Sequence, residues 1–184
     1  MIMRTMLCGM LLIGLAAIQA KADEPVSKFV RHTANANTVI VFVHGLFGDG
    51  RTTWTSADGT YWPDLLTKDD DFDGVDIFVF SYATELRATM SIDELVETMR
   101  IVLAANGVPK FKKIVFVTHS MGGLVTRAYL LKNRDVADHT LLAYFFSTPT
   151  TGSQWASMAS ALIDNPQLSK LKTLKPDEYL GDLL

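Results

Sequence analysis

Cysteine is nearly absent from this chain of 184 residues, which contains only Cys8. With a single thiol, the chain cannot form an internal disulfide or a metal site built from several thiolates. Cys8 also lies within an apolar N-terminal stretch that we expect to be removed. The mature protein should therefore have no cysteine nucleophile, and the sequence implies no metal ion and no organic cofactor.

A hydrophobic run long enough to cross a membrane is also missing near the N-terminus. The apolar stretch from Met6 to Ile18 has about 13 residues, whereas a helix needs about 20 to cross the hydrocarbon core. Arg4 precedes this stretch and the small-residue pattern Ala20-Lys21-Ala22 follows it. We predict that residues 1–22 are a signal peptide, cleaved before Asp23, and that the protein is exported to the periplasm or secreted. A membrane anchor is the alternative.

The sequence has no block of positive charge. Its 17 Lys and Arg residues are outnumbered by 20 Asp and Glu residues, for a net charge of −3. Aromatic residues are not interleaved with basic ones, so we expect no nucleic-acid partner. The acidic stretch from Lys68 to Asp73 lacks the glycine and glutamate spacing of a calcium loop and is predicted to be solvated. A small molecule or a lipid ester is the expected partner, with contact to a membrane surface left open.

Four short apolar runs predict buried strands. They are rich in Val, Ile and Phe and are nearly continuous in apolar character, which is typical of strands covered on both faces. The runs are Thr38 to Val43, Val75 to Phe80, Lys113 to Val117, and Leu141 to Phe146. Residues 23–37 are polar and mixed, and we interpret them as a lead-in before residues 38–184, which would form one domain.

Helical patterns alternate with these runs. Ser91 and Glu94 form a capping-box pattern at the start of a helix that Gly107 and Pro109 would end. Further helices are expected over residues 121–132 and 62–68. The alternation predicts an α/β fold, with a doubly wound, mostly parallel sheet flanked by helices.

The stretch from Ile114 to Gly123 carries the strongest chemical signal: an apolar strand, a tight turn at Ser120, and a helix. A serine hydroxyl is a weak nucleophile until it is exposed, held by a base and set beside donors for an oxyanion. A turn of this kind usually has the pattern G-x-S-x-G. Here Thr118 replaces the first glycine and Gly122 keeps the second, and His119 completes the turn.

A second strand also runs into a glycine-containing loop, at His44 and Gly45, about 75 residues before Ser120. The backbone N–H groups of Leu46 and Met121 are the predicted oxyanion hole, because both would lie next to Ser120. His44 is expected to shape this loop and not to act as a base.

Together these motifs resemble lipase-like serine esterases of the α/β-hydrolase superfamily, in particular the branch containing GPI inositol deacylases. The matching segments are His44 to Gly48 with Trp54, His119 to Gly123, and Ser147 to Ser153. The resemblance covers residues 38–184 and implies an α/β-hydrolase domain that lacks its last strands. In that family the acid and the histidine of the triad follow the serine, on loops after later strands.

No histidine of this chain is a convincing base. His139 precedes the strand from Leu141 and should lie at its opposite end, and His119 should point away from Ser120 by strand alternation. The sequence therefore supports two hypotheses. The first is ester or lipid-ester hydrolysis through an acyl-enzyme at Ser120, with the acid and histidine beyond Leu184. The second is a non-catalytic remnant or binding domain; a peptidase or acyltransferase on the same scaffold is also left open.

Overall fold

A single mixed sheet organises the protein. The computed structural model describes residues 26–84 and 91–149, and the strand order is β1-β3-β2-β4-β5. Strands β2 to β5 run parallel to one another, and β1 is antiparallel to its neighbour β3. The strands are β1 (Lys28–Arg31), β2 (Thr38–Val43), β3 (Val75–Phe80), β4 (Lys113–His119) and β5 (Thr140–Phe146).

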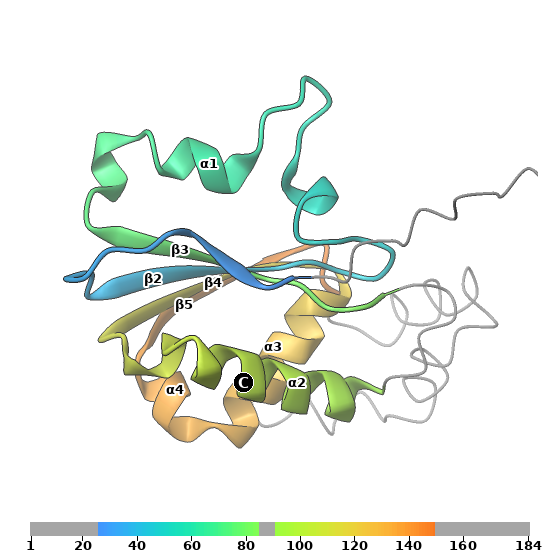
Figure 1. Cartoon of the computed structure of the whole chain (residues 1–184). Helices are drawn as coiled ribbons and strands as arrows, with labels where there is room; N and C mark the ends of the chain where they lie inside the picture. Colours follow the sequence, from blue (N-terminus) through green and yellow to red (C-terminus); the bar gives the residue numbers. More distant parts are fainter. Residues whose placement is uncertain (1–25, 85–90, 150–184) are drawn as a thin grey trace, which may run out of the picture.

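Helices cover both faces of the sheet. Helix α1 lies on one face, and α2, α3 and α4 lie on the other (Figure 1). The helices are α1 (Trp62–Leu66), α2 (Ile92–Ala105), α3 (Met121–Lys132) and α4 (Arg134–Asp138). This arrangement confirms the doubly wound, mostly parallel sheet. In the described part of the chain, no helix has the length and apolar character needed to span a membrane.

Most of the predicted elements are present with small shifts at their ends. Strands β2 and β3 and helix α3 have the predicted bounds, whereas β4 continues through His119. At the start of α2, the side chain of Ser91 accepts the N–H of Glu94 and the Glu94 carboxylate accepts the N–H of Ser91, which confirms the capping box. Gly107 then adopts a left-handed conformation with φ of 72° and ends the helix. The predicted signal peptide, residues 1–22, and the end of the third motif, residues 150–153, lie outside the described residues.

The expectation that residues 23–37 precede the fold was wrong for one segment. Strand β1 lies within them and pairs antiparallel with β3. Its own sequence is a weak strand signal, but contacts distant in sequence hold it. The Arg31 guanidinium donates to the backbone carbonyls of Val75, Thr67 and Phe72.

A buried carboxylate also anchors this edge. Asp76 at the start of β3 is 0% exposed. Its Oδ1 accepts the N–H and the hydroxyl of Thr33 at 2.8 and 3.0 Å, and its Oδ2 lies 2.6 Å from His32 Nδ1. The carboxylate therefore satisfies the backbone where β1 ends.

We expect Asp76→Ala to lower the free energy of unfolding by about 2–4 kcal/mol, because it removes the buried, charged acceptor of the Thr33 N–H and hydroxyl. The matched control is Asp73→Ala, three residues earlier and exposed, which should change it by less than about 0.5 kcal/mol. Urea unfolding of both variants measures the difference. Equal effects would show that the buried carboxylate does not anchor β1.

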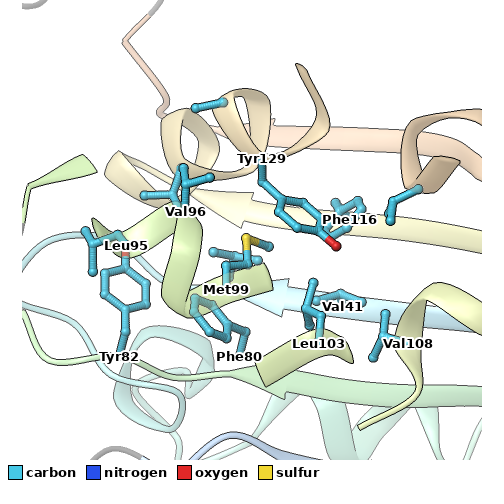
Figure 2. Packing of buried hydrophobic residues seen from close by; sticks show 14 of the residues in the cluster. Val41, Phe80, Tyr82, Leu95, Val96, Met99, Leu103, Val108, Phe116 and Tyr129 are labelled. Atoms are coloured by element: carbon cyan, nitrogen blue, oxygen red, sulfur yellow. The ribbon is translucent and has the colours of Figure 1, made fainter. Parts of the chain in front are cut away.

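The main core lies between the sheet and helices α2 and α3. Figure 2 shows Met99 and Leu103 of α2 gathered with Phe80 and Phe116 of the sheet and with Tyr129 of α3. All five side chains are at most 1% exposed. A smaller cluster on the α1 face packs around Phe42, Trp54 and Tyr61. These two layers fix the central strands and therefore the loops that follow them.

Strand β5 differs from its predicted environment. Continuous apolar character predicted a strand covered on both faces, but Leu141, Leu142 and Tyr144 are 63%, 52% and 52% exposed. Among the described residues, β5 pairs only with β4 and forms an edge of the sheet. Apolar composition alone cannot distinguish a central strand from an edge strand.

Candidate active site

Parallel strands bring four loops to one edge of the sheet. In the strand register, Val43 of β2 lies beside both Phe80 of β3 and Thr118 of β4. His119 at the end of β4 lies beside Phe146 of β5. The residues that follow these strands therefore gather at their carboxyl ends, where open α/β sheets bind ligands.

Ser120 stands at the sharpest turn of this edge. It links β4 directly to α3 with φ of 49° and ψ of −123°, which is a strained conformation for a residue with a side chain. Its N–H donates to Phe146 O at 2.8 Å, so the strand ladder continues up to the serine. A strained turn from strand to helix is the geometry that presents a nucleophilic serine above a sheet.

The loop after β2 touches this turn. A Cβ added to Gly45 would come within 2.7 Å of Ser120 Cβ and within 3.2 Å of His119 Nδ1. The glycine therefore allows the loop to approach the serine closely. His119 and Ser120 therefore both lie close to Gly45. Strand alternation alone does not predict this, because the positive φ of Ser120 ends the extended strand geometry at that residue.

Two glycines after the serine let α3 approach the sheet. A Cβ on Gly122 would lie 2.3 Å from His44 O and 2.6 Å from Val43 O, both backbone atoms. A Cβ on Gly123 would lie 2.1 Å from Thr148 Oγ1. The first glycine thus fits α3 against β2, and the second fits it against the loop after β5.

The structure also shows how Thr118 replaces the usual first glycine. Its side chain is 0% exposed and its hydroxyl donates to Tyr144 O at 2.9 Å. The hydroxyl is therefore satisfied within the sheet, which removes most of the cost of burying it. The turn closes without a glycine at this position.

Hydrogen bonds hold the predicted oxyanion loop, which also contains a residue with a strained backbone. Phe47 has a positive φ of 59°, and Gly48 N–H donates to Gly45 O at 3.2 Å. The Thr84 hydroxyl donates to Gly48 O at 2.7 Å. Leu46 lies within this loop, next to Gly45. The second predicted donor, the N–H of Met121, belongs to the first turn of α3, where helix N–H groups have no acceptor within the helix.

His44 is enclosed beneath the loop. It is 0% exposed and stacks on Tyr82 with ring centroids 4.3 Å apart. Tyr82 N–H donates to His44 Nε2 at 3.1 Å, so Nδ1 carries the proton and donates to Gly45 O at 3.0 Å. Burial lowers the pKa of His44 below 6.5. Both ring nitrogens of neutral His44 therefore have backbone hydrogen-bond partners, and the side chain supports the loop after β2.

The other histidines fall into two groups. His139 precedes β5 and His32 follows β1 beside Asp76, so both lie at the amino ends of the parallel strands. For His139 this is about 20 Å from Ser120 along the sheet. His119 is half-buried beside Ser120, and burial lowers its pKa. In the described residues, no group of three or more His, Cys, Asp or Glu side chains could hold a metal ion.

Two further residues, Thr148 and Tyr82, contact the site, although neither was predicted to belong to it from the sequence. The Thr148 hydroxyl donates to Ser120 O at 3.1 Å, and the Tyr82 hydroxyl donates to His44 O at 2.7 Å. Both side chains are buried. Their positions after β5 and β3 were the available signal, because those loops reach the same edge as Ser120. Ser147, just before Thr148, has a positive φ of 49°.

The sheet topology and the strained serine turn define a protein with the α/β-hydrolase fold. A family model described as "PGAP1-like alpha/beta domain" matches residues 34–162. The chain belongs to this family of PGAP1-like alpha/beta domains.

Solved structures show the same fold. The mature lipase BlEst2 of Bacillus licheniformis is similar over 82% of this chain and 62% of its own, with 20% identity and a TM-score of 0.50. A carboxylesterase structure from Nitrososphaera gargenis is similar over 83% of this chain and 55% of its own chain, with 14% identity and a TM-score of 0.50. The chain thus spans about three fifths of the length of these structures. No curated protein matches the sequence.

Proposed function

We propose that the protein is a serine hydrolase that cleaves carboxylic or lipid esters through an acyl-enzyme at Ser120. The observation that carries the proposal is the backbone of Ser120, with φ of 49° and ψ of −123°, held between β4 and α3. Strain of this kind is retained where the surrounding structure enforces it and where it serves a function. The lipase and carboxylesterase structures with the same fold support the ester as the substrate class.

In the proposed reaction, Ser120 Oγ forms a bond to the ester carbonyl carbon as its proton passes to a base. The negative oxygen would accept the N–H groups of Leu46 and Met121, and the positive end of α3 would stabilise it further. Loss of one such donor typically lowers the rate by about 10²–10³. Collapse of this intermediate expels the alcohol, and water then releases the acid.

One observation favours a second function, that of a non-catalytic binding domain. The sequence contains four histidines, all within the described residues. His44 has both ring nitrogens engaged, and His32 and His139 lie at the opposite end of the sheet. Activation of the Ser120 hydroxyl requires a base that takes its proton. His119 is the one histidine that lies beside the serine.

Fluorophosphonate labelling tests between these functions. The probe forms a covalent bond to an activated serine, and mass spectrometry of the chain from Asp23 onward locates the adduct. We expect labelling at Ser120 that is lost in Ser120→Ala and retained in Ser147→Ala, a matched serine that also has a positive φ. A folded chain that is not labelled would overturn the proposal that this chain itself hydrolyses esters and would favour the binding domain, with catalysis only in longer relatives that supply a base.

A further inference from the structure

Buried polar side chains gather on the short segment that follows β3. Ser81, Tyr82 and Thr84 are 7%, 3% and 5% exposed. Buried polar groups need hydrogen-bond partners, and the partners show which part of the molecule such groups hold in place. Each of these three residues has a hydrogen bond to residues 44–50, the segment after β2 that contains the predicted oxyanion loop. The segment after β3 therefore holds this loop.

Tyr82 contacts the first residue of the loop in three ways. Its N–H donates to His44 Nε2 at 3.1 Å, its hydroxyl donates to His44 O at 2.7 Å, and its ring stacks on the imidazole with a centroid distance of 4.3 Å. Because Nε2 accepts a hydrogen bond, the proton of the neutral ring lies on Nδ1, which donates to Gly45 O at 3.0 Å. The position of Gly45 O therefore depends on Tyr82 through the imidazole.

The carbonyl of Gly45 determines the direction of the Leu46 N–H. Both groups belong to one planar peptide unit, in which the C=O and the N–H point in opposite directions. Gly45 O also accepts the N–H of Gly48 at 3.2 Å. A rotation of this peptide would break both hydrogen bonds of the carbonyl and would turn the Leu46 N–H away from its present direction.

Thr84 holds the other end of the same turn. Its hydroxyl donates to Gly48 O at 2.7 Å. Phe47, just before Gly48, has a φ of 59°, a conformation that persists only where the surrounding structure enforces it. Ser81 adds a third contact, because its Oγ accepts the N–H of Gly50 at 3.2 Å. The loop is thus fixed on both sides of the peptide that carries the Leu46 N–H.

We propose that Tyr82 and Thr84 are positioning residues, which aim the Leu46 N–H at the oxyanion that forms on attack by Ser120. The inference rests on the proposed serine hydrolase function. Both residues act through the loop and not on the substrate itself. Donors for an oxyanion are most effective when the protein fixes them before the reaction, and a displacement of about 1 Å can lower a rate by about 10²-fold.

Kinetics of two variants test this role. Tyr82→Phe and Thr84→Val each remove one hydroxyl and nearly keep the shape of the side chain. For a p-nitrophenyl ester, we expect kcat to fall about 10-fold in each, because the donor is displaced but not lost. KM should change less than about twofold, since the oxyanion is absent from the bound ester. Fluorophosphonate labelling to completion counts the active sites, so a loss of folded protein does not lower the measured kcat.

Two further variants are the controls. Thr84→Ser keeps a hydroxyl and should retain most of the wild-type kcat. Tyr129→Phe alters a tyrosine that is 1% exposed and packs on Phe116 in the main core, and it should leave kcat unchanged. A wild-type kcat in both Tyr82→Phe and Thr84→Val would overturn the proposal, as would an equal loss in Tyr129→Phe.

Hydrogen exchange measures the positioning without hydrolysis. The amides of residues 45–48 should exchange about 5- to 10-fold faster in Tyr82→Phe and Thr84→Val than in the wild type, because one hydrogen bond that holds the loop is missing. In Tyr129→Phe they should exchange at the wild-type rate. A wild-type chain that is neither labelled nor active contradicts the proposed function, and exchange then decides alone whether Tyr82 and Thr84 hold the loop. Unchanged exchange in both variants would show that they do not.

Discussion

Gly122→Ala is expected to destabilise the fold by about 3 kcal/mol or more, a large fraction of the 5–15 kcal/mol typical of a domain. The new Cβ would lie 2.3 Å from His44 O and 2.6 Å from Val43 O. Both contacts are with the backbone of the central strand β2 or its continuation, so neither can be relieved by a side-chain rotation. α3 would have to move away from the sheet, taking Met121 and its N–H with it. Urea unfolding measures the loss.

Gly123→Ala provides the matched comparison, because its overlap is with a side chain. The added Cβ would lie 2.1 Å from Thr148 Oγ1 and 2.6 Å from Thr148 Cγ2. Thr148→Ala removes both atoms and should recover part of the stability lost in Gly123→Ala, whereas it should recover nothing in Gly122→Ala. Equal recovery in the two double variants would contradict the packing described for α3.

Acid is expected to destabilise the protein through His44. The pKa of His44 is lowered mainly by burial, so below the unfolded value of 6.5 the unfolded chain binds a proton that the folded chain does not. The free energy of unfolding should therefore fall as the pH drops below 6.5, by up to about 1.4 kcal/mol per pH unit for this group. Above pH 6.5 this contribution is constant. His119, whose pKa burial also lowers, adds to the effect in the same direction.

Two variants isolate the contribution of His44. His44→Gln cannot titrate, so its acid dependence should be smaller than that of the wild type by up to one proton. Tyr82→Phe loses the hydrogen bond to His44 O but keeps the N–H that donates to His44 Nε2. It should be less stable than the wild type at every pH with the same acid dependence. Unfolding midpoints between pH 5 and 8 test both, and an unchanged slope in His44→Gln would exclude His44 as the source.

The sequence predicted the elements whose signals are local. Strands β2 and β3 are continuous apolar runs, and the capping box of Ser91 marks the start of α2. Strand β1 was missed because its stability comes from Arg31 and Asp76, whose partners are distant in sequence. The exposure of β5 was missed because an edge is a property of the sheet and not of a strand.

The candidate site divides in the same way. The turn at Ser120 could be predicted because its strand, turn and helix are contiguous. The fit of Thr118 depends on a carbonyl of β5, and the contact of Thr148 with Ser120 O joins two loops that the sequence cannot place together. Gly45 was assigned to the loop from its motif, but its contact with Ser120 required the order of the strands.

The position of β2 between β3 and β4 determines when the site can form during folding. Both neighbours of β2 follow it in the sequence, and the second is synthesised about 75 residues later. The loop at Gly45 therefore has no serine to meet until β4 has been made and inserted beside β2. Such long-range pairing is slow compared with local helix formation. Loop and nucleophile are therefore brought together only when β4 pairs with β2.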